Sequence, residues 1–241
     1  MTYCLALMLD AGFVCVSDSR TNAGVDNVAI YSKLHRFEVG ARMFVLMSSG
    51  NLATTQAVVT RLRRDLEERA APNFETVAHA SEAAAYVGDV SVSVQRASED
   101  DQAELQGEFK ATFILAAHLP GEAHRCYLIY PEGNHIAATD ETPYLQIGEL
   151  KTGKAILDRL ARRSVPLGAA ARIALVSMEA AMRSNLSVGP PVEMVVYEAG
   201  ADDHGRYQKF EHDNPYWRKL SRAWNEQLRL ALDRLPRFDW E

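Results

Sequence analysis

The strongest constraint on the fold lies at the start of the chain, where residues 2–9 (TYCLALML) form an almost uninterrupted apolar run. Residues 10–12 (DAG) are a turn signal, and residues 13–17 (FVCVS) return as a second apolar run. Two such runs joined by a glycine-containing turn predict a β-hairpin. Neither run alternates cleanly between apolar and polar residues, which favours strands that are buried on both faces. Such a hairpin belongs inside a layered fold.

Blocks of strands and blocks of helices alternate along the rest of the chain. Asn73 is expected to cap the second helix, and Asn214 followed by Pro215 is expected to start the last one. The order favours a single domain over residues 1–241, with a core of about 2–212, two sheets stacked face to face and helices outside. The pattern predicts strands over 34–39 and 43–48, helices over 51–71 and 74–94, an acidic loop over 97–107, strands over 109–117, 126–130 and 135–138, helices over 149–163 and 167–183, strands over 192–198 and 207–210, and a helical extension over about 214–235.

Composition excludes several classes of protein. The chain carries 26 Lys and Arg against 32 Asp and Glu, a net charge of −6, which argues against a nucleic-acid partner. No apolar run reaches the roughly 18 residues that a membrane span needs. Cys4, Cys15 and Cys126 form no CxxC motif and lie in apolar runs, which is typical of buried, reduced thiols in the cytoplasm. The histidines are scattered, so no metal or other cofactor is expected.

The last predicted helix carries an apolar stripe with two tryptophans. Such a stripe packs on the core of its own subunit or forms an interface with another subunit, where aromatic residues are enriched. Both interpretations stay open on the sequence. The stripe consists of Trp217, Leu220, Trp224, Leu228, Ala231 and Leu235.

The first candidate for chemistry is Thr2, which directly follows Met1. Threonine is small enough for an aminopeptidase to remove the methionine before it, and we expect that removal here. The new chain would start with a hydroxyl nucleophile that carries its own base, the free α-amine. An ordinary α-amine has a pKa of roughly 7.7–8.0, so part of it is deprotonated near neutrality. It can take the hydroxyl proton during attack on an amide carbonyl.

Further residues link Thr2 to a known family. Asp18 and Arg20 follow the second strand, Lys33 precedes the next one, and Gly50 closes a strand and opens a helix. This set resembles the proteasome β-subunit, an N-terminal-nucleophile hydrolase with a four-layer αββα sandwich. The Anbu, or ancestral β-subunit-like, family is closer still. The resemblance to Anbu lies in the segments SDSRTNAGVDN (17–27), SSGNLATTQ (48–56), YLQIGELKTGKAIL (144–157) and RSNLSVGPP (183–191).

The resemblance implies a role for each matching residue. Thr2 is the nucleophile, and Lys33 lies against its hydroxyl as an ammonium that favours the alkoxide. Asp18 pairs with Lys33, and opposite charges at about 4–6 Å stabilise each other's ionised form. The backbone N–H of Gly50 donates to the oxyanion of the tetrahedral intermediate. Without Thr2, simpler interpretations hold: Asp18 and Arg20 form an ordinary turn ion pair, and Lys33 is a solvated loop cation.

The chain also departs from the proteasome pattern. Glu149 stands where proteasomes have the serine of a Gly-Ser-Gly segment, and Ser184 replaces an aspartate. Ser187 matches the second proteasome serine, so it is the fourth expected catalytic residue. Glu149 could orient the α-amine or bind a substrate N-terminus. A helix N-terminal acid favoured by the helix dipole is an equal alternative.

The sequence therefore predicts a threonine peptidase, with a peptide as substrate and an acyl-enzyme intermediate. Two alternatives stay open: a non-catalytic or weakly active peptide-binding or assembly protein on the same scaffold, and an amidase for a non-peptide amide. The resemblance also implies a homo-oligomer, either a ring or a helical open ring. The chain has no nucleotide-binding GxxxxGK[ST] motif, so any ATPase partner would be a separate chain.

Overall fold

The computed structural model describes residues 1–22, 28–101, 109–201 and 204–241. The strands and helices of these residues are, in chain order, β1 (Tyr3–Leu9), β2 (Gly12–Asp18), β3 (Arg20–Asn22), β4 (Val28–Ile30), β5 (Leu34–Val39), β6 (Arg42–Gly50), α1 (Leu52–Glu67), α2 (Ala80–Asp101), β7 (Ala111–His118), β8 (Arg125–Ile129), β9 (His135–Ala137), β10 (Tyr144–Gly148), α3 (Lys154–Leu160), α4 (Leu167–Ser184), β11 (Val192–Glu198), β12 (Arg206–Phe210) and α5 (Pro215–Asp233).

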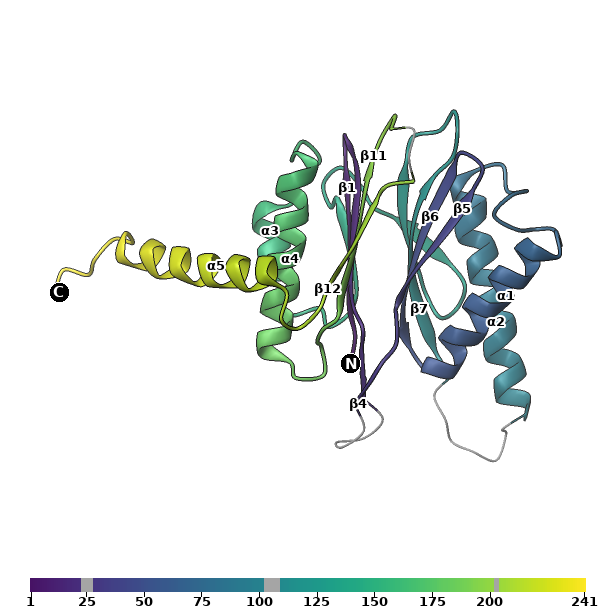
Figure 1. The fold of residues 1–241 in the computed structure, drawn as a ribbon, viewed down its shortest axis with the longest axis horizontal. Helices are drawn as coiled ribbons and strands as arrows, with labels where there is room; N and C mark the ends of the chain where they lie inside the picture. The colour runs from purple at the N-terminus through teal and green to yellow at the C-terminus, as the bar shows by residue number, and fades with distance from the viewer. Residues whose placement is uncertain (23–27, 102–108, 202–203) are drawn as a thin grey trace.

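Two five-stranded antiparallel sheets lie face to face, and a pair of helices covers the outer face of each (Figure 1). The first sheet has the strand order β10-β1-β2-β11-β12 and is covered by α3 and α4. The second has the order β5-β6-β7-β8-β9 and is covered by α1 and α2. Strands β3 and β4 form a small sheet of their own. The predicted mixture of helices with stacked antiparallel sheets is confirmed.

The first hairpin is buried on both faces, as predicted. Every residue of β1 and β2 is buried. Alternate residues of β1 point to different cores, because side chains alternate across a strand. Tyr3, Leu5 and Leu7 pack toward α3 and α4. Cys4 and Met8 pack between the sheets, so an apolar residue is needed at every position. The three cysteines are free and buried, as expected.

The region between α1 and α2 differs from the sequence prediction. Asn73 does not cap α2, which begins at Ala80. Its side-chain oxygen accepts hydrogen bonds from the N–H groups of Glu75 and Thr76, at 2.8 and 3.1 Å, and so stabilises a separate turn. An asparagine side-chain oxygen can accept backbone N–H groups both at the start of a helix and in an isolated turn. The sequence pattern therefore did not distinguish the two. Helix α2 also runs to Asp101, into the predicted acidic loop, whose residues 102–108 lie outside the described residues.

Strand β10 was not predicted, and it brings the chain back beside Thr2. It pairs with β1, with Tyr3 opposite Gly148. Gly148 has φ +87°, and a Cβ there would lie 1.9 Å from the carbonyl oxygen of Thr2. Only glycine permits this approach. The helix predicted from residue 149 begins later, at Lys154, because the chain first turns at the end of β10.

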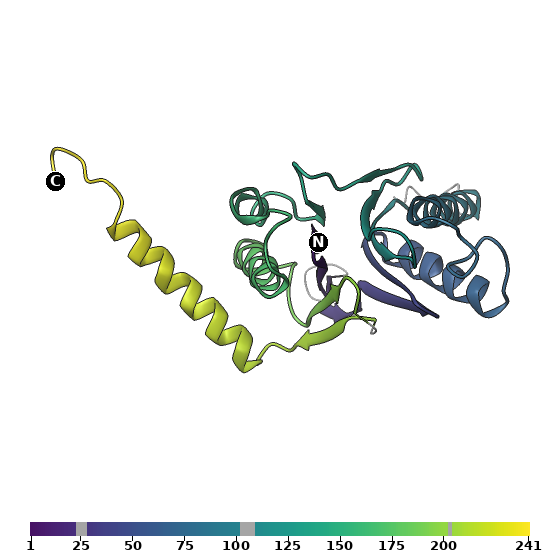
Figure 2. The same cartoon turned by 90° about the horizontal axis from the view of Figure 1, so that it is seen from above.

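Helix α5 leads away from the layered body (Figures 1 and 2). Asn214 caps it as predicted, accepting hydrogen bonds from two N–H groups of the first turn. Trp217 and Leu220 pack partly against the core of the first sheet. Leu228 and Leu235, farther along the same stripe, are 48% and 59% exposed. Core packing therefore explains only the beginning of the stripe.

No helix among the described residues combines the length and the apolar character that crossing a membrane requires.

Candidate active site

Three of the predicted site residues line one pocket. Thr2, Lys33 and Gly50 surround a cavity of about 270 Å³, which also includes Gly148. They come from the start of β1, the segment before β5 and the end of β6. The stacking of the two sheets therefore brings together residues that lie 48 positions apart in the sequence.

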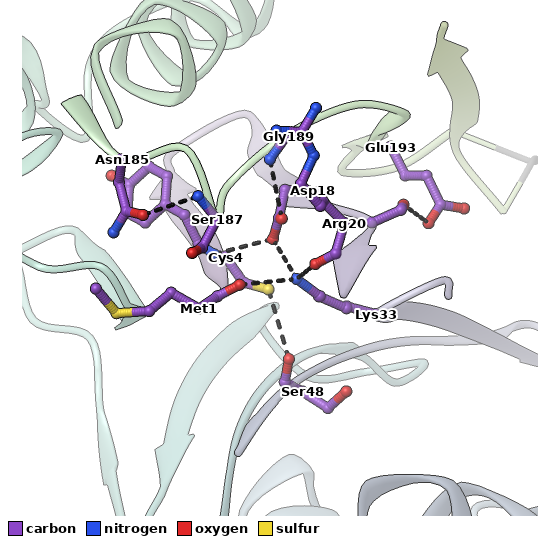
Figure 3. Close-up of polar contacts among 12 residues, drawn as sticks. Met1, Cys4, Asp18, Arg20, Lys33, Ser48, Asn185, Ser187, Gly189 and Glu193 are labelled. Carbon is purple, nitrogen blue, oxygen red and sulfur yellow. Dashed lines mark hydrogen bonds and ion pairs between the residues drawn. The ribbon is translucent and has the colours of Figure 1, made fainter. Parts of the chain in front are cut away.

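A buried ion pair forms the floor of the site (Figure 3). The Nζ atom of Lys33 lies 2.8 Å from Oδ1 of Asp18, with side chains that are 8% and 0% exposed. Lys33 also donates to the carbonyl oxygen of Arg20 at 2.7 Å. Lys33 is therefore not a solvated loop cation. Arg20 does not pair with Asp18; its guanidinium donates to the carbonyl of Leu186.

Asp18 connects three distant parts of the chain. Its Oδ1 accepts the N–H of Tyr3 at 2.9 Å as well as Lys33, and its Oδ2 accepts the N–H of Gly189 at 3.2 Å. Burial raises the pKa of the carboxyl above its ordinary value, while Lys33 and the two N–H groups act in the opposite direction. The pair stays buried because every oxygen of the carboxylate has a donor.

Gly50 occupies a backbone conformation that suits glycine. Its φ is +117°, and a Cβ would lie 2.3 Å from the carbonyl oxygen of Lys110, the residue just before the neighbouring strand β7. Gly50 is the last residue of β6, and α1 begins two residues later with Asn51 as its cap. The glycine thus lets the chain turn from strand to helix at the wall of the pocket.

The N-terminal residues lie inside the pocket. The carbonyl of Thr2 accepts the N–H of Glu149 at 2.7 Å, which fixes the start of β1 against the end of β10. Met1 also lines the pocket, and its carbonyl oxygen lies 3.5 Å from Nζ of Lys33. Burial, and next the nearby Lys33, lower the pKa of the N-terminal amine below its ordinary value of 8.0. The Met1 amine is therefore more often deprotonated than an exposed one.

No protein-family model matches the chain, and no curated protein does. Solved structures do match. An Anbu (ancestral β-subunit) protein from Yersinia bercovieri is 38% identical, with 98% of each chain covered and a TM-score of 0.90. The chain belongs to the Anbu family. It is also similar to Anbu from Hyphomicrobium sp. strain MC1, at 42% identity over 98% of this chain and 99% of that one, with a TM-score of 0.87.

A third Anbu structure, from Pseudomonas aeruginosa, is 37% identical over 98% of each chain, with a TM-score of 0.92, and is described as a helical assembly of the Anbu complex. Anbu proteins are similar to the proteasome β-subunit, so the resemblance seen in the sequence is confirmed at the level of the family.

Glu149 and Ser187 lie beside the pocket of this Anbu chain and not in its wall. The Oε1 atom of Glu149 accepts from the N–H groups of Lys151 and Thr152, and its Oε2 from the side chain of Asn185. The N–H of Lys151 is the main cause that lowers the pKa of Glu149. Because α3 begins at Lys154, Glu149 caps the preceding turn and not the helix. Ser187 lies in the loop over Asp18, where its N–H donates to Asn185 (Figure 3).

Sequence reasoning missed two residues that shape the site of this Anbu chain. Gly148 admits β10 beside Thr2, and Gly189 supplies an N–H to Asp18. A Cβ at Gly189 would lie 2.4 Å from the guanidinium carbon of Arg20, so a side chain there would displace the arginine. Both glycines belong to segments that resemble the family, but their roles depend on contacts that the sequence does not display.

Among the described residues, no group of three or more His, Cys, Asp and Glu side chains is placed to hold a metal ion. The groups available for chemistry at the pocket are the hydroxyl of Thr2, the ammonium of Lys33 held by the buried carboxylate of Asp18, and backbone N–H groups.

Proposed function

We propose that this protein is a threonine hydrolase of the N-terminal-nucleophile class that cleaves peptide bonds with Thr2. The observation that carries the proposal is the pocket in which Thr2 and Gly50 lie together with the buried Lys33–Asp18 pair. Burying an ion pair costs free energy through desolvation, so a pair beside a hydroxyl indicates a chemical use. The two stacked sheets between helix pairs suit the four-layer sandwich of that class.

The mechanism begins with removal of Met1, which frees the α-amine of Thr2. That amine takes the proton of the Thr2 hydroxyl as the oxygen attacks the substrate carbonyl. Lys33 stabilises the developing negative charge on the attacking oxygen, and the N–H of Gly50 donates to the oxyanion. The amine then protonates the leaving nitrogen, the C–N bond of the tetrahedral intermediate breaks, and the acyl group remains as an ester on Thr2. Water hydrolyses that ester, with the same amine acting as the base.

Ser187 and Glu149 take supporting positions in this proposal. Ser187 lies in the loop whose Gly189 N–H contacts Asp18, so it helps to place the hydrogen-bond donors around the carboxylate. The backbone N–H of Glu149 holds Thr2 in position. Its carboxylate is bound by its own turn and by Asn185, so we assign it to that turn and not to the substrate.

We also propose that the protein assembles with copies of itself. An Anbu relative forms a helical assembly. Helix α5 extends from the body (Figure 2), and Leu228 and Leu235 of its apolar stripe are exposed. A contact between unlike surfaces that repeats without closing produces an open helical array. Free, buried thiols suit a reducing compartment such as the cytoplasm. An ATPase that unfolds substrates would be a separate partner.

The engaged carboxylate of Glu149 favours a second candidate function. Because this residue replaces a serine of the proteasome and its oxygens are occupied, the site lacks one hydroxyl that proteasomes use. The second candidate is a peptide-binding or assembly protein on this scaffold with little or no turnover. An amidase that acts on a non-peptide amide shares Thr2 with the first candidate.

The test is the intact mass of the protein after incubation with a peptide electrophile that traps an N-terminal threonine. We expect loss of Met1 and one adduct per chain. Thr2→Ala should remove the adduct and Thr2→Ser should retain it, because serine keeps the hydroxyl nucleophile. Loss of Met1 without an adduct in either the parent or Thr2→Ser contradicts the peptidase proposal and favours the binding protein. Trapping by a small acyl electrophile alone would indicate the amidase.

A further inference from the structure

A second cavity adjoins the Thr2 pocket. It has a volume of about 760 Å³ and lies where β5 and α1 face the ends of β11 and β12. Ser32, His35 and Gln56 line both cavities, so the two spaces share one wall. The larger space therefore lies next to the place where a substrate side chain would sit beside Thr2. Nothing in the hydrolytic mechanism above uses this space.

One face of α1 forms the long side of the second cavity. Gln56, Thr60 and Arg63 line it, and their spacing of four and then three residues places them in one row along the helix. Seven residues of helix span about 10 Å, so the row leads from the shared wall to the guanidinium group of Arg63. The groups along the row are an amide, a hydroxyl and a cation, so a substrate side chain that follows it meets polar partners.

Most charged groups of this cavity are already paired. Arg36 forms an ion pair with Glu38 and lies over the ring of Tyr207, 5.3 Å from its centroid. Glu193 is 5% exposed, and its two oxygens accept hydrogen bonds from Ser19 and Tyr207 at 3.0 and 2.7 Å. The carboxylate of Glu193 therefore already has hydrogen-bond donors inside the protein and does not need one from a substrate.

Arg63 is the exception among the described residues that line the cavity. It is exposed and forms no ion pair with any carboxylate in the described part of the chain. Its charge acts on His35, because burial first and Arg63 second lower the pKa of that imidazole to about 4. His35 is thus neutral near pH 7 and can form hydrogen bonds at the shared wall. Glu193 also lacks an ion pair within the described residues, but it is buried and both of its oxygens have donors. The exposed unpaired charge in the cavity is therefore positive.

We propose that this cavity binds a carboxylate on the substrate side chain next to the attacked carbonyl, with Arg63 as the specificity-determining residue. The inference rests on the proposed function of the Thr2 pocket. A guanidinium binds a carboxylate through paired hydrogen bonds, which a neutral amide of the same size cannot match. An apolar side chain could contact Leu34 and Val59, which also line the cavity, but it would leave the polar groups along α1 without partners. The distance along α1 favours glutamate over aspartate, because the longer side chain reaches farther toward Arg63.

The test measures binding and not turnover, so that it does not depend on catalysis. Thr2→Ala protein, with loss of Met1 confirmed by mass, is titrated with acetyl-Ala-Ala-Glu-amide and with the matching glutamine and leucine peptides. NMR chemical shifts give each dissociation constant. We expect the glutamate peptide to bind at least tenfold more tightly than the glutamine peptide, since a charge-assisted pair is lost. Arg63→Ala in the same background should abolish that preference.

Arg64→Ala is the matched control. Arg64 is the next residue on α1, is also exposed and does not line the cavity, so the preference for glutamate should survive its loss. Equal binding of the three peptides, binding of none of them, or a glutamate preference that persists in Arg63→Ala overturns the inference. The two proposals fail separately. Arg63-dependent binding without an adduct at Thr2 contradicts only the hydrolase, and an adduct without a glutamate preference contradicts only the role of Arg63.

Discussion

Replacing Lys33 by methionine tests whether the buried ion pair is the centre of the site. The change removes the ammonium that lies 2.8 Å from Asp18 and 2.7 Å from the carbonyl of Arg20, and it keeps a side chain of similar length. Asp18, with a fully buried side chain, would retain only the N–H groups of Tyr3 and Gly189 as donors. Leaving one charge of a buried pair alone costs about 3–5 kcal/mol of the free energy of unfolding.

The loss should depend on pH in a defined direction. Burial already raises the pKa of Asp18, and removing Lys33 takes away the largest influence that opposes the rise. A carboxyl whose pKa is higher in the folded state binds its proton more tightly there than in the unfolded chain. The destabilisation is therefore complete above the raised pKa and disappears as the pH falls below about 3.9, the value of an unperturbed aspartate.

Urea unfolding followed by circular dichroism at pH 8 and at pH 5 measures both effects. We expect Lys33→Met to lose more stability at pH 8 than at pH 5, and the double variant Asp18→Asn, Lys33→Met to recover most of the loss. Both variants should lack adduct formation at Thr2, because neither places an ammonium beside the hydroxyl. A loss below about 1 kcal/mol that is the same at both pH values would refute the reasoning, since that is the size expected of an exposed pair.

Three further predictions concern the pocket wall, the amine and the assembly. Gly50→Ala should lower the midpoint of urea unfolding and abolish adduct formation, because its Cβ would lie 2.3 Å from the carbonyl oxygen of Lys110; an unchanged adduct yield would contradict the assigned role. Adduct formation should increase with pH with a midpoint below 8.0, since the burial and the Lys33 charge that lower the pKa of the Met1 amine would also act on the Thr2 amine once Met1 is removed; a midpoint above 8.0 would contradict this reasoning. Ending the chain at residue 213, before α5, should convert the assembly to smaller species in analytical ultracentrifugation, whereas an unchanged distribution would exclude α5 from the contacts.

Patterns within short stretches of sequence, such as apolar runs and helix-capping residues, predicted most of the strands and helices. The continuous apolar runs of β1 and β2 indicate strands buried on both faces, and Asn214 with Pro215 marks the beginning of α5. One error occurred where one residue type serves two local structures. Asn73 can cap a helix or a turn with the same oxygen, and only the surrounding packing decides between them.

The candidate site could be predicted only in part. Thr2, Lys33 and Gly50 were expected together, and they line one pocket above Asp18. The donors that complete the surroundings of Asp18 could not be predicted, because the N–H of Gly189 meets it through sheet pairing across 171 residues. The surroundings of Glu149 were equally hidden, because one of its partners is Asn185, which lies on a loop beyond α4.

The hydrogen bond from the N–H of Gly189 to Asp18 joins residues far apart in the sequence, and this has a consequence for synthesis of the chain. Asp18 acquires its donor from Gly189 only after four-fifths of the polypeptide exists, and β11, which places that loop beside β2, comes later still. Contacts between residues so far apart form late, because the intervening chain must first be ordered. A nascent chain on the ribosome would therefore carry Thr2 without the finished surroundings of Asp18. We expect the nucleophile to stay inactive until its own subunit has folded, so the growing chain and its neighbours are not exposed to it.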